Sequence, residues 1–214
     1  ASFVNNFSNI AIFACVGFTY GLTPIIGAMY ARGETDRIGR AVRVGIWVNT
    51  LFTIAVASIM LGIYFNLHRL GQPDELMPLI RPYYLIVLSG MLPVCIFNVL
   101  AQWSFGCNDT ALPTWIVLAA NAVNIFGNYL LIYGNWGLPE LGLTGAGIST
   151  LTARFICMGA ILWVFFGTRR GTPYIAGFRA KADRSDGMFR RVAATGFPVS
   201  MQMTFETPHS PARR

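Results

Sequence analysis

Asparagine side chains recur at helical spacing inside an uncharged, apolar stretch in the middle of the chain. Asn124 and Asn128 are four residues apart and Asn121 precedes Asn124 by three, so a helix would carry all three on one face. An amide donates and accepts hydrogen bonds but does not titrate. Such a face predicts either a polar lining for a bound ligand or ordinary hydrogen bonds between helices.

The next apolar stretch adds hydroxyl groups and one cation. Thr150 and Thr152 are followed by Arg154, which lies one helical turn beyond Thr150 on the same face. An arginine left in lipid costs at least about 2.5 kcal/mol, so Arg154 must face a bundle interior or extend to the membrane surface. The apolar stretches contain no Asp or Glu. We therefore expect its partner to be backbone and amide oxygens or a helix outside this chain. Asn98, in an earlier apolar stretch, is a further candidate for the polar lining.

Residue patterns typical of catalysis or of a zinc site do not occur in the sequence. The four cysteines show no C-x-x-C spacing, and His68 and His209 form no H-E-x-x-H pattern. There is no G-x-S-x-G sequence and no phosphate-cradling glycine loop. The sequence therefore predicts neither an enzyme nor a resident cofactor.

The distribution of charges indicates that the apolar stretches cross a membrane. Only 12% of the residues are charged, and the mean hydropathy is +0.53. A transmembrane helix needs roughly 20 mostly apolar residues. Five stretches supply them: 1–31, 44–67, 82–108 and 110–139 carry no charge, and 141–168 carries only Arg154. They do not alternate with period two, as barrel strands would. We predict an all-α polytopic membrane protein with about five transmembrane helices, in which Pro24 and Pro93 kink two spans.

Basic residues predict the orientation of these spans. Eleven Lys and Arg lie in the connection between the first two spans and in the segment after the fifth, against Arg69 and Arg81 in the connection between the second and third. The positive-inside rule places the basic side in the cytoplasm. The net charge of +7 is thereby explained without nucleic acid, since no aromatic-interleaved basic patch accompanies it.

The two ends of the sequence indicate a piece of a longer protein. The chain begins in an apolar run without an initiator methionine, so we expect a further segment upstream. A sixth apolar run, 192–206, ends at Glu206 and predicts the start of a sixth helix. Residues 207–214 form a tail whose origin the sequence does not show.

Four segments resemble the multidrug and toxic compound extrusion (MATE) family and follow that family's order. They are GLTPIIGAMYARGETDRIGRAV (21–42), GCNDTALP (106–113), NAVNIFGNYLLIYGNWGLPELGLTGAGIST (121–150) and GFPVS (196–200). The resemblance extends over nearly all of 3–206. Its most specific part is the asparagine-rich span followed by G-x-P-x-L-G-x-x-G-A-G-x-x-T.

The resemblance implies a twelve-helix transporter of two six-helix lobes with a central cleft, in the cytoplasmic (inner) membrane. Residues 1–168 would hold five transmembrane helices of the first lobe. Residues 169–191 would form the basic cytoplasmic linker between the lobes, and 192–206 the start of the first helix of the second lobe. Its partners would be the lipid bilayer and the remaining helices of the parent transporter, with no nucleic acid.

The resemblance also implies the site residues. Asn124 and Asn128 stand where the proton-coupled prokaryotic branch has an Asn and, four residues on, an Asp; because an amide carries no proton, this departure speaks against a first-lobe carboxylate mechanism. The chain is more similar to the sodium-coupled branch, whose Glu on helix seven matches Glu206. Glu206 would bind H⁺, or Na⁺ as a metal ligand, and with the two asparagines it forms the expected cation-coupling set. The expected lining of the substrate cavity is Asn98, Asn121, Thr150, Thr152, Arg154 and Gln202.

The function implied is secondary active multidrug efflux, an antiport of small organic cations or toxic amphiphilic drugs against Na⁺ or H⁺. One alternative is a flippase of a related family for lipid-linked oligosaccharides, whose cavity would need more Arg and Lys to bind pyrophosphate. Another is a non-transporting membrane scaffold. The amide at Asn128 favours the scaffold, and the retained Glu206 opposes it.

Overall fold

The computed structural model describes residues 11–12, 15–65, 77–134, 141–180 and 187–206, which contain α-helices and no β-strand. The helices are α2 (Leu22–Ala31), α3 (Thr35–Phe65), α4 (Met77–Ser89), α5 (Met91–Gly106), α6 (Ala111–Tyr133), α7 (Gly142–Gly167), α8 (Thr172–Arg179) and α9 (Met188–Glu206). The predicted all-α class is confirmed.

Four of the described helices are long and apolar enough to cross a membrane. They are Thr35–Gly62, Pro82–Gly106, Ala111–Ile132 and Thr144–Gly167, and they match the second to fifth predicted spans. The first predicted span, 1–31, corresponds to the shorter apolar helix Cys15–Ala31, because residues 1–10 and 13–14 lie outside the described residues. The chain is a multi-pass membrane protein.

Two prolines coincide with interruptions of helices, as predicted. Pro93 lies in the first turn of α5, and the span that contains it is broken at Gly90, just after α4 ends at Ser89. Proline has no N–H to donate to the carbonyl four residues earlier, which here is the carbonyl of Ser89. Pro24 likewise follows a break in its helix, which lies three residues earlier at Gly21.

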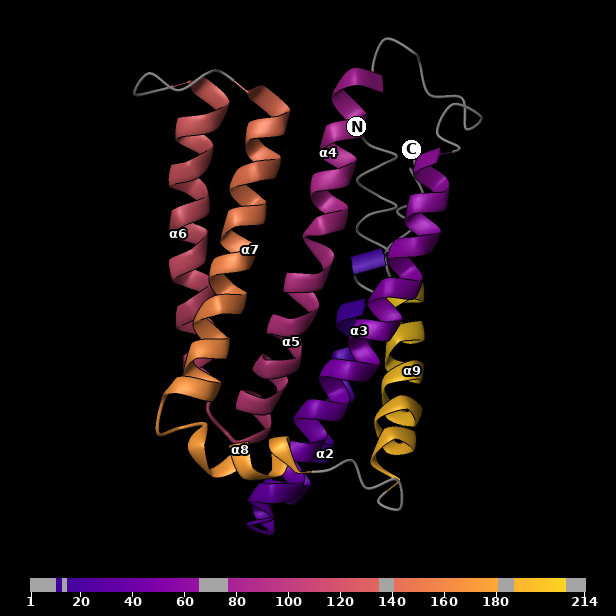
Figure 1. The fold of residues 1–214 in the computed structure, drawn as a ribbon, viewed down its shortest axis with the longest axis vertical. Helices are drawn as coiled ribbons and strands as arrows, with labels where there is room; N and C mark the ends of the chain where they lie inside the picture. Colours follow the sequence, from indigo (N-terminus) through magenta and orange to yellow (C-terminus); the bar gives the residue numbers. More distant parts are fainter. Residues whose placement is uncertain (1–10, 13–14, 66–76, 135–140, 181–186, 207–214) are drawn as a thin grey trace, which may run out of the picture.

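The long helices stand side by side as a bundle, and α8 lies across one end of it (Figure 1). α6 packs on α7, α7 contacts α5 and α4, and α5 contacts α3 and α2. α9 packs against α3 and α2, on the opposite side of the bundle from α6. Large apolar side chains of α6, such as Trp115 and Ile125, are exposed, as expected of a helix that faces lipid or further helices.

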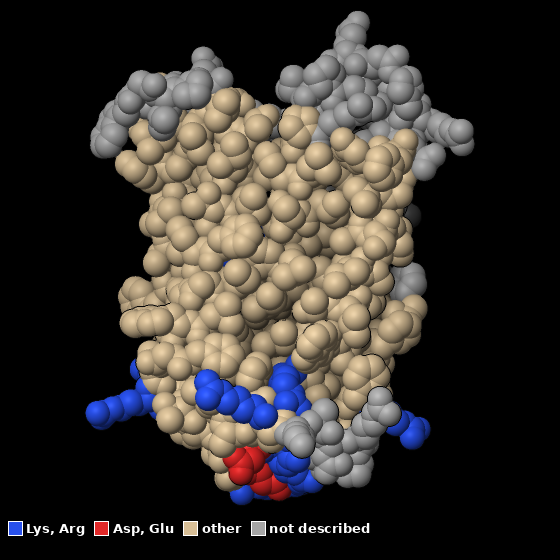
Figure 2. Space-filling view, viewed as in Figure 1, with Lys and Arg blue, Asp and Glu red and all other residues tan. Residues whose placement is uncertain are grey.

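Charged side chains gather at the end of the bundle where α8 lies (Figure 2). The connection from α2 to α3 and the segment around α8 both reach this end, and both are rich in arginine. The prediction that these two segments share a side is confirmed for the described residues. Arg69 and the side chain of Arg81 lie outside the described part of the chain.

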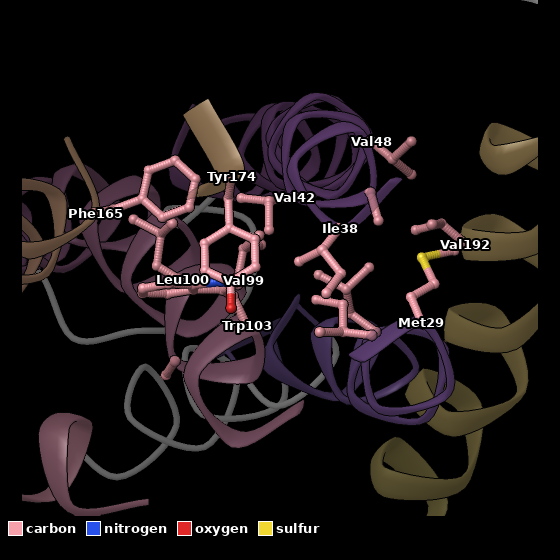
Figure 3. Close-up of a cluster of buried hydrophobic side chains, with 14 of the residues drawn as sticks. Met29, Ile38, Val42, Val48, Val99, Leu100, Trp103, Phe165, Tyr174 and Val192 are labelled. Atoms are coloured by element: carbon pink, nitrogen blue, oxygen red, sulfur yellow. The ribbon is translucent and has the colours of Figure 1, made fainter. Parts of the chain in front are cut away.

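Buried side chains from several helices form a core at the same end (Figure 3). Ile38 of α3, Leu100 of α5 and Phe165 of α7 are fully buried. The ring of Trp103 meets that of Phe165 edge to face with centroids 4.9 Å apart, and Tyr174 of α8 approaches the same indole at 5.5 Å. Burying one such side chain is worth about 1.5–3 kcal/mol, so these contacts hold α8 against the bundle.

Two glycines allow α8 to lie directly on α3. A Cβ on Gly177 would lie 1.9 Å from the carbonyl oxygen of Asp36, and one on Gly39 would lie 2.0 Å from that of Tyr174. Both distances are far below a van der Waals contact, and the obstructing atoms belong to the backbone. Only residues without a Cβ fit this crossing.

Arg43 of α3 binds the C-terminal end of α8. Its Nη1 donates to the carbonyl oxygen of Phe178 at 3.1 Å and also to that of Ala180. Carbonyls at the end of a helix have no partner within the helix and attract cations. The guanidinium therefore fixes the end of α8 on the bundle.

Candidate functional site

Hydrogen bonds centred on Asn124 join α6 to α7. The Nδ2 of Asn124 donates to Ser149 Oγ at 3.4 Å and to Thr150 Oγ1 at 3.3 Å. Ser149 Oγ donates in turn to the carbonyl oxygen of Asn124 at 2.8 Å. The predicted asparagine face of α6 therefore meets hydroxyl groups of α7.

Glycines bring the two helices close enough for these short side chains to meet. A Cβ on Gly127 would lie 2.5 Å from Ser149 Oγ, and one on Gly145 would lie 2.5 Å from the carbonyl oxygen of Leu131. The N–H of Leu141, at the start of α7, donates to the same Leu131 carbonyl at 3.0 Å. Close approach at glycine is the usual way that membrane helices pack.

Asn128 extends the network by one turn of α6. Its Nδ2 donates to Asn124 Oδ1 at 3.2 Å. Its own Oδ1 is buried and accepts no hydrogen bond within the described part of the chain. A buried oxygen without a donor costs about 1–3 kcal/mol, so this position favours a bound donor, water or cation.

A cavity of about 220 Å³ lies beside this network, between α5, α6 and α7. Its polar lining is Asn121, Asn124, Thr150 and Arg154, all of which the sequence predicts as site residues. Its walls are otherwise apolar. They are formed by Val94, Phe97, Val117, Ala120, Ala153 and Cys157.

Arg154 separates this cavity from a second one of about 110 Å³ next to α4. Its guanidinium lies over Gly90, where a Cβ would be 2.6 Å from Nη1. This side chain was expected either to face the bundle interior or to extend to the membrane surface, and the structure shows it in the bundle interior. Within the described residues Arg154 has no ion-pair partner, and the acidic side chains of Glu34, Asp36 and Asp109 belong to the basic end of the bundle.

Two predicted lining residues of α5 and α7 lie outside both cavities. Asn98 Nδ2 donates to the Val94 carbonyl oxygen of its own helix at 2.8 Å. Thr152 is exposed, and its Oγ1 donates to the Ile148 carbonyl oxygen of its own helix at 2.9 Å. Each satisfies its polar group locally.

Both predicted residues of the sixth apolar run belong to α9, a helix that does not pack on α6. Gln202 is exposed on α9, which packs against α2 and α3 rather than against α6. Glu206 is the last residue of α9, and its side chain lies outside the described residues. The cation-coupling set therefore stays a prediction.

Ser149 and Asn49 are among the buried polar residues that sequence analysis did not identify. Ser149 is the fourth residue after Gly145, and this small-x-x-x-small spacing could have identified it as a packing position. Asn49 of α3 is 2% exposed, donates to the Cys95 carbonyl oxygen at 3.3 Å, and has an Oδ1 without a partner in the described residues. Thr53, four residues later on the same face of α3, is also 2% exposed, so the helical spacing of the two polar residues could have identified this position.

A further cavity of about 240 Å³ lies at the basic end, where α8 begins. Arg170 Nη1 donates to Asp109 Oδ2 at 2.7 Å, which joins the α5–α6 connection to the α7–α8 connection. Cys107 and Tyr174 line the same cavity. Burial raises the pKa of the Cys107 thiol and that of the Tyr174 phenol, so both groups stay neutral near pH 7.

Residues 1–130 match the MatE family. A probable multidrug resistance protein NorM of Bradyrhizobium diazoefficiens is 33% identical over 200 residues, covering 89% of this chain and 42% of that protein. A probable NorM of Geobacillus kaustophilus is 31% identical over 195 residues, again covering 89% of this chain and 42% of the relative. The chain thus spans about two fifths of the length of these relatives.

Solved structures share the fold. An inward-facing multidrug resistance MATE family transporter matches with a TM-score of 0.76 at 17% identity, covering 94% of this chain and 44% of that one. The eukaryotic MATE transporter AtDTX14 matches with a TM-score of 0.77 at 16% identity, covering 96% of this chain and 44% of that one. With the sequence match over more than half of its length, the chain belongs to the MATE family.

Proposed function

We propose that the chain forms most of one lobe of a secondary active exporter in the cytoplasmic (inner) membrane. It would export small organic cations or amphiphilic drugs in exchange for Na⁺ or H⁺. The observation that carries this proposal is the partly polar cavity between α5, α6 and α7, set in helices that are otherwise apolar. A cavity of this composition suits an amphiphile, whose apolar body and polar end need different surfaces.

We infer the following roles for the residues that line the cavity. Phe97 and Val117 would contact the apolar body of the substrate, and the Phe97 ring face would attract a cationic group. Asn121 and Thr150 would orient the substrate through hydrogen bonds. The relatives named as probable multidrug resistance proteins support an exporter.

We infer that Glu206 couples transport to the cation together with the amides of Asn124 and Asn128. Because α9 packs against α2 and α3 while both asparagines belong to α6, we place the carboxylate and the amides at separate points of the translocation path. The unpaired Oδ1 of Asn128 suits contact with a hard cation, but only Glu206 can carry a proton. Rocking of the two lobes would expose the cavity to either side in turn.

The test uses the full-length parent protein in everted membrane vesicles. Uptake of a fluorescent organic cation is measured under an imposed Na⁺ gradient and, separately, under an imposed H⁺ gradient. We expect one of the gradients to drive accumulation, and Glu206→Gln to abolish it, since glutamine keeps the shape but cannot ionise. Gly159→Ala in α7, where a Cβ meets nothing within 4 Å, is the control and should retain accumulation.

The outcomes separate the alternatives. Accumulation under neither gradient would contradict an exporter and favour the flippase or the scaffold. Accumulation that survives Glu206→Gln would keep the exporter and exclude Glu206 as the coupling residue.

A further inference from the structure

Sulfur-containing side chains meet in a small buried cluster on the side of α5 that faces α3. They are at most 2% exposed and come from the helical segment 15–20, from α3 and from α5: Cys15, Met60, Met91 and Cys95. Described residues already enclose them, so their burial does not depend on helices outside this chain. Thiols and thioethers are the side chains that soft metal ions prefer. The cluster therefore has the composition of a soft-metal site.

The two thiols of this cluster are direct neighbours. Cys15 and Cys95 are free cysteines, distant in sequence, whose thiols form a hydrogen bond with each other. Met91 precedes Cys95 by four residues, so both side chains lie on the same face of α5. A thiol is a weak donor and a weak acceptor, and this hydrogen bond by itself adds little stability. Two adjacent sulfur atoms can instead bind one metal ion between them.

Polar groups of α3 lie against the thiol pair. Asn49 Nδ2 donates to the Cys95 carbonyl oxygen at 3.3 Å, and the Thr53 hydroxyl lies beside both sulfur atoms. Thr53 is 2% exposed, and within the described residues its Oγ1 has no hydrogen bond of good geometry. A buried hydroxyl without a partner is unfavourable in an apolar core. Beside metal-bound thiolates its O–H would have an acceptor, as groups next to metal ligands usually do.

A positive charge lies close to the thiol pair. A thiol loses its proton when it binds a metal ion, so a monovalent ion between two thiolates leaves one net negative charge. The Arg154 guanidinium interacts electrostatically with Cys95 and lies over Gly90, the residue before Met91. Its charge balances that of the complex, which a buried ion requires. A divalent ion with two thiolates would be neutral and would leave the charge of Arg154 without this balance.

We propose that Cys15 and Cys95 bind one soft monovalent metal ion, of the class of Cu⁺ and Ag⁺, between the helical segment 15–20 and α5. The ion displaces both thiol protons to water, and Met91 supplies a thioether as a third ligand. Zinc sites and iron–sulfur clusters use three or four protein ligands, and the described residues contain no group of three His, Cys, Asp or Glu that could hold one. The bound ion would hold the helical segment 15–20 on α5. This site is independent of the export function proposed above.

Binding of Ag⁺ to the purified full-length parent, in detergent and chloride-free buffer, tests this site. All cysteines except Cys15 and Cys95 are replaced by alanine, so that other thiols do not contribute. Free ion is removed by gel filtration, and bound silver is counted by mass spectrometry. We expect about one ion per chain, and about tenfold less in Cys15→Ser and in Cys95→Ser, because a hydroxyl is a poor ligand for a soft ion. Silver should also raise the unfolding temperature of the parent and leave that of both variants unchanged.

Cys107→Ser is the matched control in the otherwise unchanged parent. It removes the thiol at the C-terminal end of α5, outside the cluster, and should leave the stabilisation by silver unchanged. X-ray absorption of the silver-loaded parent needs no variant, and we expect sulfur neighbours only around the ion. Absence of bound silver, binding that survives Cys95→Ser, or oxygen and nitrogen neighbours would each overturn the proposal. Equal affinity for Zn²⁺ would overturn it as well, because the pair would then not select a soft monovalent ion.

Discussion

The side chain of Asn124 joins α6 to α7. Its side chain donates to Ser149 and Thr150 across the helix interface and accepts from Asn128 along its own helix. Asn98 is also an amide within a span, yet among the described residues its side chain bonds to the carbonyl four residues earlier on its own helix and to no other helix. Spacing along the sequence predicted the shared face of Asn124 and Asn128. It could not distinguish Asn124 from Asn98, because the difference lies in which helix is the neighbour.

We predict that Asn124→Ala destabilises the protein by about 1–2 kcal/mol, since hydrogen bonds between membrane helices are worth about 0.6–1.7 kcal/mol each. Asn98→Ala should cost less than about 0.5 kcal/mol, because it loses a bond within one helix and no helix contact. Thermal unfolding of the full-length parent in detergent measures both. Equal shifts in the two variants would show that the hydrogen bonds between α6 and α7 contribute no more to stability than a bond within one helix.

At the scale of elements, patterns that are continuous in sequence were predictable and contacts between distant segments were not. The long spans followed from stretches without charge, and the break at Gly90 followed from Pro93. α8 was not predicted as a helix, since it has only eight residues and lies in an arginine-rich segment that resembles a linker. What holds it is its crossing with α3 at Gly39 and Gly177. The cavity between α5, α6 and α7 was not predictable for the same reason, because it results from the packing of separate helices.

We predict that Gly177→Ala displaces α8 from α3 and destabilises the protein by about 1–3 kcal/mol, the usual cost of overpacking. Gly159→Ala in α7 is the matched control, because a Cβ there meets nothing within 4 Å. Maleimide labelling of Cys107, with the other cysteines replaced, adds a local readout. Burial raises the pKa of this thiol, and only the thiolate reacts, so labelling should begin above the pH usual for cysteine.

Once α8 leaves, Cys107 loses the cover that Tyr174 provides in their shared cavity. The onset of labelling in Gly177→Ala should then move to lower pH, towards that of an ordinary thiol. An identical pH profile in Gly177→Ala and Gly159→Ala would show that α8 stays in place without the glycine contact.

At the scale of the whole molecule, α9 connects the described lobe to the part of the transporter that we propose to follow it. A Cβ on Gly196 of α9 would lie 2.6 Å from the Phe18 carbonyl oxygen, and one on Gly21 would lie 2.8 Å from the Gly196 nitrogen. The contact falls at the break that precedes Pro24. A backbone contact at an interrupted helix is a suitable pivot for two lobes that rock against each other.

We predict that Gly196→Val separates transport from binding. Valine would push α9 away from the Phe18 backbone, and overpacking of about 1–3 kcal/mol shifts a two-state equilibrium about five- to 150-fold, enough to slow alternation of the lobes. The cavity between α5, α6 and α7 lies apart from α9, which contacts α2 and α3, so the affinity for the fluorescent organic cation should change less than about twofold. Vesicle uptake and fluorescence anisotropy measure the two quantities on the same variant, with Gly159→Val as the control in α7.

Loss of uptake with intact binding would place the pivot at Gly196. Unchanged uptake, or equal loss of uptake and binding, would show that this contact supports the fold and does not control the motion.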